Sequence, residues 1–87
     1  MISKTTDGFW KSYYALPAEI QQRAKRSYQA FRIDPYHPGL GFEKLNSSNL
    51  WSVRIGLHYR ALGRKHDDNT IVWQWIGTHE AYNKLIR

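Results

Sequence analysis

Apolar residues recur at helical spacing through the first third of the chain and at alternate positions through its second half. We predict a first helix that begins near Asp7, as its N-cap, and runs to about Ala15. Pro17 would open a second helix, because its missing N–H costs nothing in a first helical turn. The apolar faces are formed by Phe9, Trp10, Tyr13 and Tyr14 in the first helix and by Ile20, Ala24, Tyr28 and Phe31 in the second. The tight break between two short helices predicts an antiparallel helical hairpin.

Prolines and glycines between Asp34 and Gly41 end the helical part of the chain. From Phe42 onward the apolar period changes from about 3.6 to about 2 residues, which is typical of strands. The expected elements are strands at 42–45, 50–55, 59–64 and 70–77, a polar hairpin loop at 65–69, a short helix or irregular tail at 79–86 and, at most, a short edge strand at 2–4. This order predicts an α+β domain, with two N-terminal helices packed on an antiparallel sheet of about four strands.

Alternation within residues 51–55 predicts the register of the central hairpin. Odd positions are apolar and even positions are polar, so one face is expected to pack under the helices. Residues 56–58 are expected to form a three-residue loop. The resulting pairs are Ile55 with Tyr59 and Val53 with Ala61 on the helix side, and Arg54 with Arg60 on the open side.

Two opposed arginines on an open sheet face indicate a site for an anion. Like charges directly across a sheet repel each other. Paired guanidinium groups nevertheless bind phosphate well, because they are permanently charged and donate hydrogen bonds in pairs. The alternative is that Arg54 or Arg60 forms a structural ion pair with Glu43, Glu80 or an aspartate.

The last predicted strand and the segment after it bring further groups to this face. Trp73 and Trp75 are two positions apart and are expected on one side of the strand. His79 and Tyr82 follow directly, and this strand should neighbour the one that carries Arg60. We therefore expect an imidazole and a phenol within reach of the arginine pair.

Composition narrows the classes of protein to which the chain can belong. Its 87 residues are enough for one domain, over residues 1–87, and leave no room for two. The absence of cysteine excludes disulfides and thiolate metal sites and fits a reducing cytoplasm. No apolar stretch approaches the ~20 residues that span a membrane, so we expect a cytoplasmic protein with no membrane partner. The formal charge of +6 by itself favours nucleic acid, an acidic protein or an anionic membrane surface as a partner, without choosing among them.

These residue types suit cleavage of RNA without a metal or a cofactor. In that reaction the 2′-hydroxyl attacks the adjacent phosphorus, so one group must take its proton, another must protonate the leaving 5′-oxygen, and cations must stabilise the phosphate. The candidates are His79, His58 and Glu43 for the protons, Arg60, Arg54 and Lys44 for the charge, and Tyr82 as an orienting or proton-handling group. The four histidines show no close-spaced ligand motif, so no metal site is expected.

The chain also resembles the RelE/ParE family of bacterial toxins in the order and spacing of four blocks. The blocks are Leu16–Gln21, Asp34–Gly39, Leu50–Gly56 followed by His58–Leu62, and Trp75–Tyr82. The resemblance implies a microbial RNase-like fold and, as in RelE and YoeB, cleavage of mRNA in the ribosomal A site. It also implies a cognate antitoxin, whose acidic or amphipathic segment wraps the domain and covers the basic face.

The resemblance assigns roles to particular positions. The catalytic set that it implies is Arg60, Arg54, His79 and Tyr82. Glu43 falls near a catalytic glutamate of YoeB-like members, and Lys44 is all that this sequence has of the lysine-rich stretch of RelE. Two alternatives remain open, because one fold can serve several functions. One is a ParE-like member that binds DNA gyrase and blocks it without catalysis, and the other is an inactive relative that binds only antitoxin.

Overall fold

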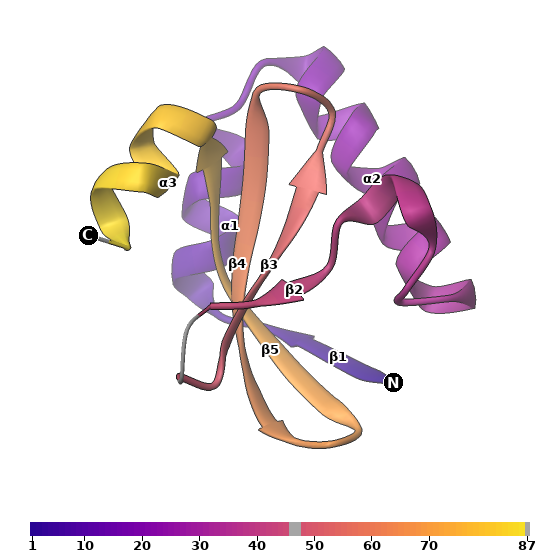
Figure 1. Ribbon diagram of the computed structural model, residues 1–87. Helices are drawn as coiled ribbons and strands as arrows, with labels where there is room; N and C mark the ends of the chain where they lie inside the picture. Colours follow the sequence, from indigo (N-terminus) through magenta and orange to yellow (C-terminus); the bar gives the residue numbers. More distant parts are fainter. Residues whose placement is uncertain (46–47, 87) are drawn as a thin grey trace.

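One mixed sheet of five strands runs through residues 1–45 and 48–86, the part of the chain that the computed structural model describes. The strands are β1 (Ile2–Thr5), β2 (Glu43–Lys44), β3 (Leu50–Ile55), β4 (Tyr59–Asp67) and β5 (Thr70–Thr78), in the spatial order β1-β5-β4-β3-β2. Helices α1 (Asp7–Tyr14) and α2 (Ala18–Ile33) lie behind the sheet in Figure 1, and α3 (His79–Leu85) follows directly on β5. A short 3-10 helix, η1 (Pro38–Leu40), joins α2 to β2. The predicted α+β class, with two N-terminal helices on a sheet, is confirmed.

The N-terminal strand is the main departure from the prediction. β1 pairs with β5 in parallel, from Ile2 opposite Thr70 to Thr5 opposite Trp73. The sheet therefore has five strands rather than four and is mixed rather than wholly antiparallel. The signal in the sequence was weak because Ile2 is the one apolar residue of this strand, and edge strands are commonly short and polar.

Local hydrogen bonding determines where the helices begin. Thr6, and not Asp7, caps α1, because its Oγ1 accepts a hydrogen bond from the N–H of Phe9 at 3.1 Å. Pro17 is the residue before the first turn of α2. Helix α1 packs against β5 and α2 against β3, so the two helices cover one face of the sheet. Among the described residues, no helix combines the length and the apolar character that crossing a membrane requires.

The central hairpin has the predicted register. The pairs between β3 and β4 are Ile55 with Tyr59, Arg54 with Arg60 and Val53 with Ala61. Its turn needs a glycine, since Gly56 has a φ of 64°, where a Cβ would be strained. The apolar pairs belong to the core under the helices, with Tyr59 partly buried against it. Burial fixes this register, because a shift by one residue would turn the apolar side chains outward.

Strand β5 changes the face that its side chains occupy part-way along. Leu62 pairs with Trp75 and Gly63 pairs with Trp73, so Gln74 is an extra residue in a β-bulge. Trp73 is buried in the core under the helices, whereas Trp75 is not part of that core. The prediction that both tryptophans share one face was therefore wrong.

The turn between β4 and β5 is shorter than predicted. β4 extends to Asp67 and β5 begins at Thr70, so Asp68 and Asn69 alone lie between the strands, rather than residues 65–69. The carboxylate of Asp67 accepts a hydrogen bond from the N–H of Asn69 at 2.8 Å, and this bond holds the pKa of Asp67 below its ordinary value. A polar residue such as Asp67 can therefore belong to a paired strand right up to the turn when its side chain accepts a hydrogen bond from the turn.

Candidate functional site

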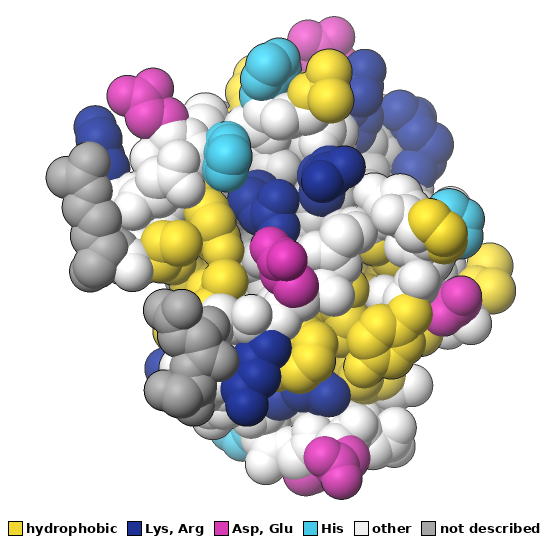
Figure 2. Space-filling view, in the orientation of Figure 1, with side chains coloured by type: hydrophobic (Ala, Val, Ile, Leu, Met, Phe, Trp, Pro, Cys, Tyr) yellow, Lys and Arg dark blue, Asp and Glu magenta, His cyan; other side chains and the backbone are white. Residues whose placement is uncertain are grey.

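The open face of the sheet, opposite α1 and α2, carries the charged residues that the sequence singled out. Figure 2 looks at this face and shows Lys and Arg side chains near its centre, with a carboxylate and a histidine close by. Polar residues of β3 and β4 gather here because alternate positions of both strands are committed to the core. Arg54 and Arg60 lie directly opposite each other.

Arg60 lies at the centre of a network that joins four elements. Its side chain is only 12% exposed. Nη2 donates hydrogen bonds to Oε1 of Glu43 at 3.3 Å and to Oγ of Ser52 at 3.0 Å. Cζ lies over the ring of Tyr82, 5.2 Å from its centroid. The guanidinium is thus held from β2, β3 and α3 as well as from its own strand, and its position is fixed.

The side chains of the two opposed arginines take separate paths. Arg60 runs diagonally across β3 to Ser52, which lies two positions from Arg54. Arg54 is exposed, and its guanidinium lies beside Gly41, where an added Cβ would be 3.8 Å from Nε and Nη2. This separation and the Arg60–Glu43 ion pair reduce the repulsion expected of opposed like charges. The structural ion pair considered for one arginine therefore exists, and Glu43 is the partner.

Helix α3 brings His79 and Tyr82 to Arg60. Thr78 caps the helix with its side chain, and the backbone N–H of His79 donates to the carbonyl of His58 at 2.7 Å. These bonds tie the start of α3 to the turn between β3 and β4. Tyr82 is only 4% exposed, while His79 is exposed, and their rings stack with centroids 6.0 Å apart. Tyr82 therefore packs against the guanidinium, and His79 stands beside it toward solvent.

The structure brings together some of the predicted site residues and separates others. We call the assembled group the Arg60 cluster; its members are Arg60, Glu43, Ser52, Tyr82 and His79. Lys44 follows Glu43 on β2, and strand alternation directs its side chain to the other side. His58 meets the cluster through its backbone carbonyl. Glu80 lies 3.9 Å from Lys84 within α3, so it pairs with neither arginine.

Ser52 is the member of the cluster that the sequence did not reveal. It is 0% exposed, although an even position of an alternating strand is expected to face solvent. The available signal was its diagonal position relative to Arg60 in the predicted register, because diagonal neighbours are within reach of a long side chain.

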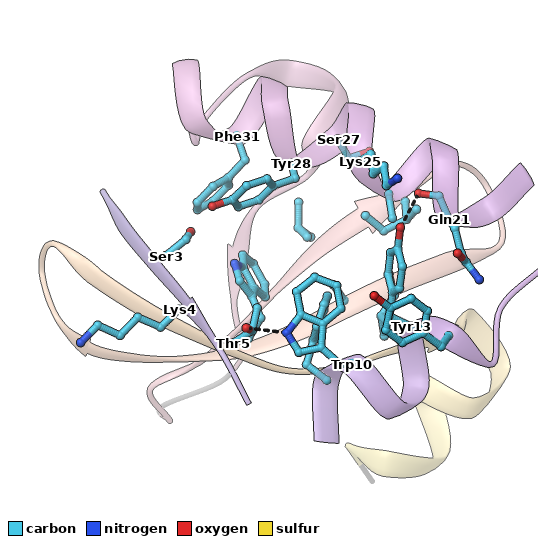
Figure 3. A pocket seen from close by; sticks show the side chains of 18 residues that line it. Ser3, Lys4, Thr5, Trp10, Tyr13, Gln21, Lys25, Ser27, Tyr28 and Phe31 are labelled. Carbon is cyan, nitrogen blue, oxygen red and sulfur yellow. Dashed lines mark hydrogen bonds between the residues drawn. The ribbon is translucent and has the colours of Figure 1, made fainter. Parts of the chain in front are cut away.

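A sizeable hollow lies on the other face of the sheet. It is an open groove of about 460 Å³ between α1, α2 and β1, lined mostly by apolar and aromatic side chains. Figure 3 shows Trp10 and Tyr13 of α1 facing it from one side, and Tyr28 and Phe31 of α2 from the other. No member of the Arg60 cluster lines this groove. We place the candidate site on the open face because the charged and hydrogen-bonded groups gather there.

The described residues also show whether metal-ligating side chains form a cluster. Over residues 1–45 and 48–86, no group of three or more His, Asp or Glu side chains is arranged to hold a metal ion. The Arg60 cluster itself offers a fixed cation, an exposed imidazole and an exposed carboxylate.

Two helices behind a mixed sheet, with a cationic cluster on the free face, define a small α+β domain. The family model described as the ParE-like toxin domain matches residues 18–84, which is more than half of the chain. The chain belongs to this family, and thus to the RelE/ParE toxins. No curated protein sequence matches it.

Solved structures share the fold at low sequence identity. A chain of the RelB–RelE antitoxin–toxin complex from Methanococcus jannaschii is 16% identical, with a TM-score of 0.75 over 97% of this chain and 99% of that one. The YoeB/ParE toxin from Agrobacterium tumefaciens is 18% identical, with a TM-score of 0.69 over 91% and 99% of the two chains. YafQ from E. coli is 15% identical, with a TM-score of 0.69 over 92% and 94%. The likeness extends over nearly the whole of each chain.

Proposed function

We propose that this chain is the toxin of a type II toxin–antitoxin system and that it cuts messenger RNA on the ribosome without a metal ion. The 2′-oxygen attacks the adjacent phosphorus as its proton is removed, and the 5′-oxygen leaves with a proton, which yields a 2′,3′-cyclic phosphate and a 5′-hydroxyl. The observation that carries the proposal is the Arg60 cluster, in which a fixed guanidinium lies with an imidazole and a carboxylate on an open face.

Arg60 supplies the positive charge in this mechanism. A guanidinium held by Ser52, Glu43 and Tyr82 needs little reorganisation when negative charge develops on the phosphate, which is the condition for strong electrostatic stabilisation. Its Nε is buried and has no hydrogen-bond partner among the described protein atoms, so a phosphate oxygen would satisfy this donor only if neighbouring side chains moved to admit it. Arg54, exposed beside the cluster, binds the RNA backbone.

His79 and Glu43 handle the protons. His79 is exposed, and an imidazole is suited to proton transfer near neutral pH. The side chain of Glu43 is 66% exposed, so the carboxylate can turn from Arg60 toward the 2′-hydroxyl. The burial of Tyr82 suits an orienting role better than a proton-handling one. His58, whose carbonyl accepts the hydrogen bond from the N–H of His79, contacts RNA outside the reacting bond, whereas Lys44 points to the other side of the sheet and is not assigned a role in the reaction.

We infer two kinds of macromolecular partner. The M. jannaschii structure is an antitoxin–toxin complex, and the same fold in this chain supports a cognate antitoxin here. A net charge of +6 supports binding of mRNA and ribosomal RNA as well as of an acidic antitoxin segment. Both partners belong to the cytoplasm, where translation takes place.

A gyrase-binding inhibitor is the second candidate function, and one observation favours it. Arg60 and Tyr82 are almost buried, and Glu43 already pairs with Arg60 in the free chain. A toxin that acts by binding alone does not need to expose this arginine. An inactive relative that binds only antitoxin is the third possibility, and it differs from both in leaving growth unaffected.

The deciding experiment is primer extension on a translated reporter mRNA after brief induction of the protein in bacteria. Wild type is compared with His79→Ala and Arg60→Ala, and Arg32→Ala on α2 is the matched control because it removes a cation away from the open face. We expect cuts within translated codons for wild type and the control, and none for the other two variants.

The other outcomes separate the alternatives. Growth arrest without any cuts would contradict the RNase proposal and support the gyrase inhibitor, which supercoiling of a plasmid in the same cells would reveal. Normal growth with folded protein present would support the inactive relative. Cuts that persist in His79→Ala and Arg60→Ala would keep the RNase function but move its site elsewhere.

A further inference from the structure

Ser52 has no assigned role, yet its environment is unusual for a serine. It is 0% exposed, and among the residues that the structure describes it is the one polar or charged residue that is buried. On the open face it lies between Glu43 of β2 and Leu62 of β4, its two cross-strand partners. A buried hydroxyl is retained when it has a hydrogen-bond partner, and here the partner is Nη2 of Arg60 at 3.0 Å.

The two acceptors of Arg60 differ in charge and in mobility. Glu43 is anionic and its side chain is 66% exposed, so it both neutralises Arg60 and is free to move. Ser52 is neutral and fully buried, so it fixes the guanidinium without reducing its charge. A phosphate that binds Arg60 competes with the Glu43 carboxylate for the same cation, but it has no charge-based reason to displace Ser52.

We propose that Ser52 is a positioning residue, which keeps the Arg60 guanidinium in its active orientation after Glu43 has turned away. This inference rests on the proposed RNase function. Once Glu43 is released, the Ser52 hydroxyl and the ring of Tyr82 are the contacts that hold Arg60. Ser52 acts through Arg60 and does not itself touch the RNA.

The first test is cleavage of a short mRNA on programmed ribosomes by wild type, Ser52→Ala and Ser52→Thr. We expect Ser52→Ala to lower kcat by about tenfold while KM changes less than twofold, because a misplaced cation fails mainly in the transition state. Ser52→Thr keeps the hydroxyl and should recover most of the lost kcat. A change in KM alone, or a threonine variant as slow as the alanine variant, would overturn the proposal.

Val53→Ala is the matched control for structural damage. Val53 is the next residue of β3, is 5% exposed and belongs to the core on the opposite face. Its truncation should lower stability more than Ser52→Ala does and leave kcat unchanged, at a temperature where every variant is folded. Equal losses of kcat in the two variants would show that the effect of Ser52→Ala is merely structural.

A double variant tests whether Ser52 acts through Arg60. In an Arg60→Ala background, Ser52→Ala should cause no further loss of single-turnover cleavage, because the group that it positions is gone. A second tenfold loss would show that Ser52 acts independently, and the proposal would be wrong.

A measurement without RNA separates this proposal from the function on which it rests. The Nε–H resonance of Arg60, observed by ¹⁵N NMR, reports how rigidly the guanidinium is held. We expect Ser52→Ala to increase its motion and its hydrogen exchange several-fold, and Ser52→Thr to do so much less. If wild type does not cut RNA but Ser52→Ala loosens the Arg60 guanidinium, the RNase proposal is wrong and the positioning by Ser52 holds. If wild type cuts RNA and the Arg60 resonance is unchanged in Ser52→Ala, the RNase proposal holds and the positioning by Ser52 is wrong.

Discussion

At the scale of single residues, the side chain of Arg60 is buried almost as fully as a core side chain, although it lies on the open face of the sheet. The alternation of β3 and β4 indicated that Arg60 lies on the open face and opposite Arg54, and both points are correct. The pattern could not show that a long side chain crosses a neighbouring strand, where it becomes 88% buried between Ser52, Glu43 and Tyr82. Periodicity gives the direction in which a side chain leaves the backbone, and the path beyond Cβ depends on neighbours that come from distant parts of the sequence.

The two opposed arginines should therefore differ in their contribution to stability. Arg60→Ala leaves the buried hydroxyl of Ser52 without a partner and removes the packing on Tyr82, so we expect the free energy of unfolding to fall by about 1–2 kcal/mol. Arg54→Ala, at an exposed position, should change it by less than about 0.5 kcal/mol. Urea denaturation of both variants measures the difference. Equal values would mean that the contacts of Arg60 add nothing to stability.

At the scale of elements, prediction succeeded where burial and turn chemistry agreed and failed where the strand period was interrupted. The β3–β4 register was correct because a buried face and a glycine at the turn allow only one pairing. In β5, the bulge at Gln74 places Trp75 on the face of the sheet opposite that of Trp73, and no local sequence pattern marks a bulge of this kind. Strand β1 was weakly indicated because it is held by parallel pairing to a strand that comes more than sixty residues later.

The packing of Trp75 gives Gly77 a specific structural requirement. The ring of Trp75 lies against Gly77, and an added Cβ would clash with Cζ2 of the indole. We expect Gly77→Ala to displace the ring and to lower the free energy of unfolding by about 1–3 kcal/mol. Gly8→Ala in α1 is the control, since its Cβ would meet nothing closer than 3.6 Å, and it should stabilise by up to about 1 kcal/mol. Thermal unfolding, followed by tryptophan fluorescence, compares the two, and a neutral Gly77→Ala would count against this packing.

At the scale of the whole molecule, the sheet separates two environments. The helix side holds the core and the aromatic groove, and the open side holds the Arg60 cluster. A formal charge of +6 by itself indicated an anionic partner but could not say where on the surface that partner binds. The fold supplies the place, because α1 and α2 cover one face and leave the polar positions of β3 and β4 uncovered.

Dependence on salt tests whether the open face is where RNA binds. Binding of a single-stranded RNA should weaken with salt, and the slope of log affinity against log salt should shrink by about 0.7 in Arg54→Ala for one lost phosphate contact. Arg32→Ala should leave the slope unchanged, since Arg32 lies on α2 behind the sheet, 6.0 Å from the ring centroid of Tyr28. Fluorescence anisotropy at several salt concentrations measures both slopes. A larger change for Arg32→Ala would place the RNA on the helix side.

The parallel pairing of β1 with β5 affects the order in which parts of the fold can form. Both β1 and α1 find their place in the sheet against β5, which lies far along the chain, and the Arg60 cluster also needs α3, which follows β5. Pairing across more than sixty residues is a contact of high sequence separation, and such contacts form late in folding because a long loop must close first. Completion of the Arg60 cluster therefore depends on contacts between segments that lie far apart in the sequence, and we expect it to be a late event in folding.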